Sequence, residues 1–62
     1  RSLYVVRDMV EGERFTEENV RSIRPAYGLA PEMLEWLLEG KKSSRTLKRG
    51  TPLKNEDIED GR

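Results

Sequence analysis

The chain has 62 residues, twelve of them Lys or Arg and twelve Asp or Glu, so its formal net charge is zero. This length permits one domain, spanning residues 1–62, close to the lower limit at which a hydrophobic core alone holds a fold together. Cys and His are both absent, which excludes disulfides, thiol nucleophiles, imidazole bases and the usual zinc ligand sets. The longest apolar run, Leu3 to Val6, has four residues and falls far short of the roughly 20 that a membrane-spanning helix needs. High charge with few aromatic residues would suit disorder, but apolar residues recur in register and favour a folded domain.

A pattern of residues near the start of the chain recurs near its end at a constant offset of 38 positions. The repeated unit reads basic, apolar, glycine, apolar, Glu, Asn or Asp, apolar. The first copy is Arg7, Met9, Gly12, Phe15, Glu18, Asn19 and Val20, and the second is Arg45, Leu47, Gly50, Leu53, Glu56, Asp57 and Ile58. A solenoid requires three or more repeats. We therefore expect the two copies to clasp each other about an approximate two-fold axis.

The first elements in chain order are a strand, a turn and a capped helical turn. Leu3 to Val6 is β-branched and aromatic, which predicts a short strand. The segment from Asp8 to Glu13 contains a repeat glycine and predicts a turn. Thr16 can cap a helical turn at residues 17–19, because its hydroxyl can accept a free amide hydrogen.

A second strand, a loop and a helix are expected next. Residues 20–24 mix apolar and polar side chains and predict a strand that ends at Pro25, since proline biases the preceding residue toward extended geometry. Residues 25–28 predict a loop. Pro31 suits the first position of a helix of about two turns that runs to Glu39 and ends at Gly40.

The second half is expected to hold a strand around residues 45–47, a glycine turn at 48–52 and a helical turn at 55–57. Residues 59–62 are expected to be frayed. The fold class predicted from these elements is small and mostly β, with short strands and one or two short helical turns.

Arg24 is the candidate binding residue. It lies at the end of a predicted strand, just before Pro25, where a guanidinium can be held at a rim and can hydrogen-bond a carbonyl, carboxylate or phosphate group. The alternative is an ordinary surface arginine paired with an acid, and spacing alone favours that alternative. Tyr27 offers a similar choice between a ligand-facing ring and a packing residue, and packing is again favoured.

No residue is assigned a catalytic or metal-binding role. Glu17 with Glu18, and Glu56 with Asp57, are adjacent acids, but neighbours in a helical turn point in different directions and we expect them to be solvated. The repeat glycines lack the Lys-Ser/Thr of a phosphate-binding loop. The basic cluster at residues 41–49 lacks interleaved aromatics, so we favour a solvated face over a nucleic-acid interface.

Several segments together resemble a known family. They are RSLYVV at residues 1–6, GE at 12–13, FTEENVRSIRP at 15–25, YGL at 27–29, GKK at 40–42 and KRGTPL at 48–53. They resemble the antifreeze-like (SAF) domain at the C-terminus of bacterial sialic acid synthases, and VRSIRP and YGL look closest to the pseudaminic acid synthases. The chain has no initiating Met, which suggests a module cut from a longer polypeptide.

The resemblance implies a β-clip (pretzel) fold with internal pseudo-two-fold symmetry. It also implies a cytoplasmic parent enzyme whose TIM barrel condenses phosphoenolpyruvate with an N-acetylated amino sugar, using a divalent metal such as Mn or Mg. The domain itself would be noncatalytic and free of cofactors, and as an excised fragment it would be a monomer. In a domain-swapped homodimer it would cap the neighbouring subunit's barrel, with Arg24 contacting the sugar's N-acetyl group. Ala26 departs from the glycine that many relatives have after Arg-Pro.

Two alternatives stay open. One is a stand-alone SAF binding or chaperone-like module, as in pilus and flagellar assembly proteins. The other is ice binding, because type III antifreeze proteins share the fold. With 39% charged residues, ice binding is the weaker of the two.

Overall fold

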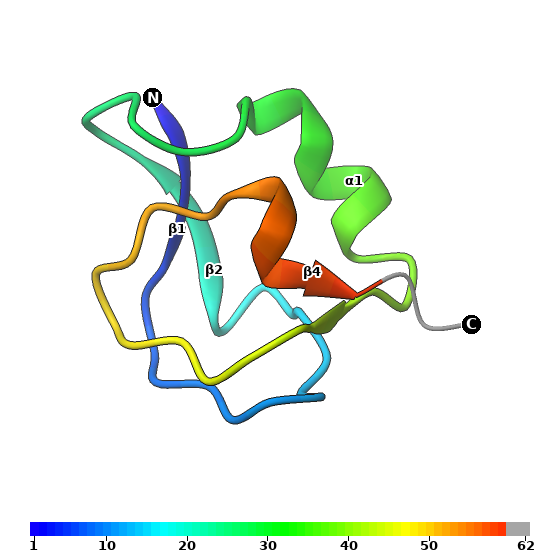
Figure 1. Ribbon diagram of the computed structural model, residues 1–62. Coiled ribbons are helices and arrows are strands. Elements are labelled where there is room, and N and C mark those ends of the chain that lie inside the picture. The colour runs from blue at the N-terminus through cyan, green and yellow to red at the C-terminus, as the bar shows by residue number, and fades with distance from the viewer. Residues whose placement is uncertain (60–62) are drawn as a thin grey trace.

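In the computed structural model, which describes residues 1–59, two small antiparallel sheets are joined by turns and short helical segments (Figure 1). The strands are β1 (Ser2–Val5), β2 (Val20–Ile23), β3 (Lys42–Ser43) and β4 (Ile58–Glu59). The helical segments are η1 (Pro31–Met33), α1 (Leu34–Leu37) and η2 (Asn55–Asp57). β1 pairs with β2, and β3 pairs with β4. The predicted class, small and mostly β with short strands, is confirmed.

All four residues of β1 are buried because other segments bond to both of its edges. On one edge β1 pairs with β2, in the register Ser2 opposite Ile23 and Val5 opposite Val20. On the other edge its main chain bonds to residues 29, 50, 51 and 53. This strand was predicted one residue too late, and its type was predicted correctly from its β-branched and aromatic residues.

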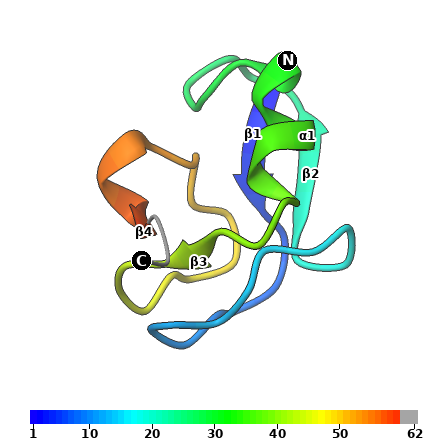
Figure 2. The ribbon, with the colours of Figure 1, turned by 90° about the vertical axis from the view of Figure 1, so that its right-hand side faces the viewer.

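The hydrophobic core draws on both halves of the chain and on the helix. Its buried members are Leu3, Val5, Met9, Phe15, Val20, Leu37, Leu47 and Leu53. Figure 2 shows α1 lying over the β1–β2 sheet, which is where its buried residue Leu37 joins the core. Fully burying an aliphatic or aromatic side chain of this size stabilises a fold by about 1.5–3 kcal/mol.

Main-chain hydrogen bonds of the first half recur in the second at the offset of 38. Met9 and Leu47, which are equivalent in the repeat, bond to each other in both directions. The other matched pairs are Val5 N to Thr51 O with Ser43 N to Glu13 O, Gly50 N to Val5 O with Gly12 N to Ser43 O, Leu53 N to Leu3 O with Phe15 N to Lys41 O, and Val6 N to Asn19 O with Ser44 N to Asp57 O. Each copy of the repeat therefore supplies hydrogen-bonding partners to the other.

The two repeat glycines form the predicted turns. Gly12 and Gly50 have φ angles of 85° and 93°. Residues other than glycine rarely adopt this left-handed backbone conformation. Thr16 also acts as predicted, because its Oγ1 accepts a hydrogen bond from the amide of Glu18 at 3.2 Å. The short turn at residues 55–57 is present as η2.

The helix differs from the prediction at both ends. Residues 31–33 form a 3₁₀ turn, and α-helical geometry begins only at Leu34. α1 ends at Leu37, two residues before the predicted end at Glu39, and the amide of Leu38 closes its last turn onto Leu34 O. Gly40, with φ of 98°, belongs to the turn that follows. Trp36 lies at the helix surface beneath Lys41, whose Nζ is 4.9 Å from the ring centroid.

Two predictions for the second half were wrong. The strand expected at residues 45–47 lies instead at Lys42–Ser43, and Leu47 makes an isolated bridge to Met9. Glu59 is not frayed but pairs with Lys42 in the β3–β4 sheet, while residues 60–62 lie outside the described part of the chain. Both errors have one cause: a Lys-Ser strand carries no β-branched or aromatic signal, and its extended geometry comes from partners distant in sequence.

Candidate functional site

Arg24 follows the last residue of β2 and precedes Pro25, to which it is joined by a cis peptide bond. Its side chain is exposed. Within residues 1–59 the guanidinium makes no hydrogen bond or ion pair, so none of the acids described there holds it. The ordinary surface pairing weighed as the alternative role is therefore not formed in this part of the chain. We refer to residues 24–28 as the Arg24 loop.

The Arg24 loop is held to β1 by a serine that the sequence analysis did not single out. Ser2 Oγ donates to the carbonyl oxygen of Pro25 at 3.0 Å and accepts from the amide of Gly28 at 2.9 Å. Ser2 is only 1% exposed. Its partners are more than 20 residues away, so no local pattern in the sequence could have identified it.

Gly28 is required by close packing and not by its φ angle. A Cβ atom at this position would overlap the carbonyl oxygen of Leu3 and would lie 2.9 Å from the main-chain nitrogen of Leu53. These are main-chain atoms, which cannot rotate away as a side chain could. The loop therefore lies directly against the backbone of β1 and of the second half.

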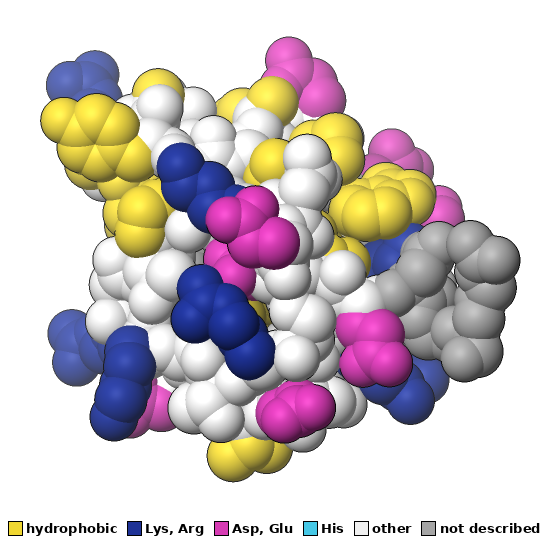
Figure 3. All heavy atoms as spheres, viewed as in Figure 1, with side chains coloured by type: hydrophobic (Ala, Val, Ile, Leu, Met, Phe, Trp, Pro, Cys, Tyr) yellow, Lys and Arg dark blue, Asp and Glu magenta, His cyan; other side chains and the backbone are white. Residues whose placement is uncertain are grey.

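Tyr27 and Ile23 give the Arg24 loop an exposed apolar surface. Tyr27 is 67% exposed, which excludes the packing role favoured for it from the sequence, and Ile23 is also exposed. Figure 3 shows hydrophobic side chains gathered over the corner that this loop occupies, next to basic side chains. An aromatic ring and an aliphatic side chain near a guanidinium suit a ligand that has both a nonpolar face and a carbonyl group.

A separate hollow of about 470 Å³ lies at the other end of β2. It is lined by Arg7, Glu13, Arg14, Thr16, Glu18 and Asn19. Two arginines and two glutamates leave it without net charge, and neither Arg24 nor Tyr27 reaches it. The hollow and the Arg24 loop are therefore distinct features.

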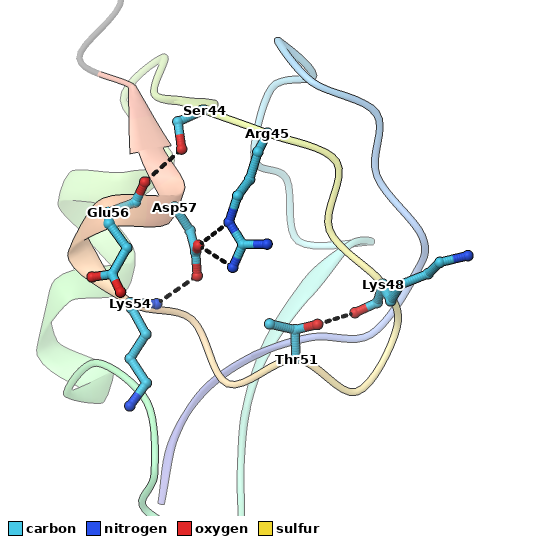
Figure 4. Close-up of polar contacts among 7 residues, drawn as sticks. All are labelled: Ser44, Arg45, Lys48, Thr51, Lys54, Glu56 and Asp57. Carbon is cyan, nitrogen blue, oxygen red and sulfur yellow. Dashed lines mark hydrogen bonds and ion pairs between the residues drawn. The ribbon is translucent and has the colours of Figure 1, made fainter.

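Asp57 corrects the expectation that the acids at 56–57 are solvated, because it is 0% exposed. Figure 4 shows its carboxylate facing Arg45. Oδ1 lies 2.8 Å from Nε and 2.7 Å from Nη2 of Arg45, while Oδ2 accepts from the amide of Lys54 at 3.0 Å. The carboxylate is occupied in holding η2 to the preceding segment, so its role is structural.

Asn19 performs the matching task in the first half. Its Oδ1 accepts from the amide of Thr16 at 2.8 Å, and its Nδ2 donates to the carbonyl oxygen of Arg14 at 3.0 Å.

Within residues 1–59, no group of three or more acids is placed to hold a metal ion. In the same residues, no helix has the length and hydrophobicity needed to cross a membrane.

The SAF domain family model matches residues 1–59. The chain belongs to the SAF domain family. It is 49% identical over 59 residues to a pseudaminic acid synthase of Campylobacter jejuni serotype O:2, and 46% identical over 59 residues to a pseudaminic acid synthase of Helicobacter pylori. Each alignment covers 95% of this chain and 17% of the relative. This SAF domain thus spans about one sixth of the length of those relatives, and the resemblance to the pseudaminic acid synthase group is confirmed.

Proposed function

We propose that this SAF domain is the noncatalytic, substrate-binding lid of a nonulosonic acid synthase, and specifically of the pseudaminic acid type. The observation behind this proposal is the exposed Arg24 on a braced loop, without a partner among residues 1–59. It occurs in a chain about half identical to pseudaminic acid synthases. These relatives favour a synthase domain over a stand-alone assembly module or an ice-binding protein.

In the proposed reaction, phosphoenolpyruvate condenses with an N-acetylated amino sugar on a TIM barrel. Arg24 donates hydrogen bonds from its guanidinium to the carbonyl oxygen of the N-acetyl group, and it makes or breaks no covalent bond itself. Its contribution is to fix the sugar's orientation and to help exclude water. Tyr27, on the same loop, borders the sugar.

The partner in this proposal is the barrel of the neighbouring subunit in a domain-swapped homodimer. The divalent metal, Mn or Mg, belongs to the barrel and not to this domain, and the enzyme acts in the cytoplasm without nucleic acid or membrane. For the fold, we propose a β-clip in which the two copies of the repeat are related by an approximate two-fold axis. The hydrogen bonds matched at the offset of 38 support that symmetry.

The test is Arg24→Ala in the full-length synthase that carries the domain. We expect the Michaelis constant for the sugar to rise or turnover to fall, while the melting temperature stays within about 1 °C of the parent, as for an exposed side chain without partners. Arg21→Ala is the matched control, because Arg21 is an exposed arginine on β2, the strand that Arg24 follows. Unchanged kinetics in Arg24→Ala, or equal losses in both variants, would reject the role of Arg24.

A further inference from the structure

Ser2 is a buried polar residue, and within residues 1–59 its hydroxyl bonds only to the Arg24 loop. We propose that Ser2 is a positioning residue, and that its hydroxyl sets the geometry in which the loop presents the Arg24 guanidinium to the sugar. This inference rests on the function proposed above. Ser2 itself touches no substrate, so its effect on the reaction passes through Arg24.

The two hydrogen bonds of Ser2 close a short bridge across the loop. The hydroxyl donates to Pro25 O at 3.0 Å and accepts from Gly28 N at 2.9 Å, so that one oxygen holds both ends of the segment. Ser2 lies opposite Ile23 in the β1–β2 register, which places the bridge immediately beside Arg24. Because Ser2 is almost fully buried, its hydroxyl is shielded from water.

The loop packs against the main chain of Leu3 and Leu53 at Gly28, but it has few hydrogen bonds between its ends. Among residues 1–59, the two bonds with Ser2 Oγ are the only hydrogen bonds that the main chain of residues 25–28 makes. Beyond the loop, Leu29 is fixed by its amide to Leu53 O at 2.8 Å and by its carbonyl to Leu3 N at 2.9 Å. Removing the hydroxyl would therefore release the segment that follows Arg24 while both flanking anchors stay in place.

The second half has no counterpart of this bridge. At the offset of 38, the position of Ser2 is occupied by Gly40, which has no side chain. β3 begins two residues after Gly40, so this position lies outside the β3–β4 pair. In the first half the main chain of Ser2 is part of the β1–β2 pair, while its hydroxyl bonds to the Arg24 loop.

Ser43 provides a matched control. It is also fully buried, and its Oγ donates to a main-chain carbonyl, that of Val10, at 2.8 Å. That contact braces the turn before Gly12 and not the Arg24 loop. Ser2→Ala and Ser43→Ala therefore remove the same atom from equally buried sites. Both should lower stability, Ser2→Ala by more because it removes two hydrogen bonds and Ser43→Ala one.

The experiment measures the kinetics of the full-length synthase with four variants: Ser2→Ala, Ser43→Ala, Arg24→Ala and the Ser2→Ala/Arg24→Ala double variant. We expect Ser2→Ala to raise the Michaelis constant for the sugar roughly fivefold, the scale of one lost hydrogen bond, and Ser43→Ala to leave it unchanged. In the Arg24→Ala background the further effect of Ser2→Ala should vanish, because a residue that acts through another is not additive with it. Equal effects in Ser2→Ala and Ser43→Ala, or full additivity in the double variant, would overturn the inference.

Hydrogen exchange gives a readout that does not depend on activity. In Ser2→Ala, the Gly28 amide should exchange faster, while the Leu29 amide keeps its protection. Unchanged protection at Gly28 would contradict the bridge.

The kinetics separate this inference from the proposed function. Wild-type kinetics of Arg24→Ala would contradict the proposed function, whereas wild-type kinetics of Ser2→Ala beside an impaired Arg24→Ala would contradict only this inference. Should Ser2→Ala not fold, Ser2→Cys and Ser43→Cys, which keep a side chain of similar shape with a weak donor, carry the same comparison.

Discussion

Met9 and Leu47, equivalent in the repeat and 38 residues apart in sequence, exchange both of their main-chain hydrogen bonds, with N···O distances of 2.8 and 2.9 Å. Their side chains are both buried in the core. Met9 and Leu47 are thus direct neighbours at the junction of the two halves. At this point each half hydrogen-bonds to the equivalent residue of the other.

This junction predicts similar costs for truncating either side. Met9→Ala and Leu47→Ala should each lower the free energy of unfolding by about 2–5 kcal/mol, because both leave a cavity in the shared core. Chemical denaturation measures the loss. Val10→Ala, at an exposed neighbouring position, should change it by no more than about 0.5 kcal/mol. A large cost on one side only would argue against equivalent halves.

Asp57→Asn should be tolerated better than Asp57→Ala. Asparagine keeps an acceptor for the amide of Lys54, as Asn19 does for Thr16 in the first half, whereas alanine leaves that donor unsatisfied and also frees Arg45. We expect Asp57→Ala to cost about 1.5–3 kcal/mol, the scale of a hydrogen bond to a charged group, and Asp57→Asn to cost less. Thermal unfolding of both variants tests the order, and a reversed order would contradict this reading of η2.

Gly28→Ala and Gly12→Ala should act by different mechanisms. At Gly12 the added Cβ meets nothing within 4 Å, so the cost is left-handed strain alone, about 1–2 kcal/mol, and the sugar kinetics should not change. At Gly28 the Cβ collides with main-chain atoms of both halves, so the Arg24 loop must shift. We expect the Michaelis constant for the sugar to rise in Gly28→Ala even when its stability loss equals that of Gly12→Ala. Equal kinetics in the two variants would show that the loop position does not matter.

Tyr27→Ala tests whether the exposed ring borders the sugar. At 67% exposure the ring adds little to the fold, so stability should change by no more than about 0.5 kcal/mol. The Michaelis constant for the sugar should rise, and Tyr27→Phe, which keeps the ring, should restore most of the affinity. Val10→Ala, which removes an equally exposed side chain elsewhere, serves as the control. An unchanged constant in Tyr27→Ala would remove Tyr27 from the site.

The sequence predicted those parts of the fold that have a local signal. Tyr4 is aromatic and Val5 is β-branched, Gly12 and Gly50 have positive φ, and Thr16 caps the turn that follows it. β3 was missed because Lys42 and Ser43 become a strand through partners that lie far along the chain. The exposed Arg24 was selected from its place before proline, while its role remains a prediction.

The burial of Asp57 and the bridge made by Ser2 could not be predicted for a related reason. Asp57 follows another acid, and Ser2 follows the charged Arg1. Both patterns are typical of surface positions. Their burial depends on where Arg45 and the Arg24 loop lie in space. Side-chain roles of this kind become visible only when the three-dimensional contacts are known.

The outer edge of β1 bonds to residues 29, 50, 51 and 53. Three of these four residues lie near the end of the domain and are synthesised late. During translation, the outer edge of β1 therefore lacks most of its hydrogen-bonding partners until almost the whole domain has left the ribosome. Neither half can satisfy its own main-chain hydrogen bonds, because several of the partners lie in the other half. Bringing such distant residues together carries an entropic cost. Cutting the chain between the repeats should consequently yield two unfolded peptides that regain structure only when mixed.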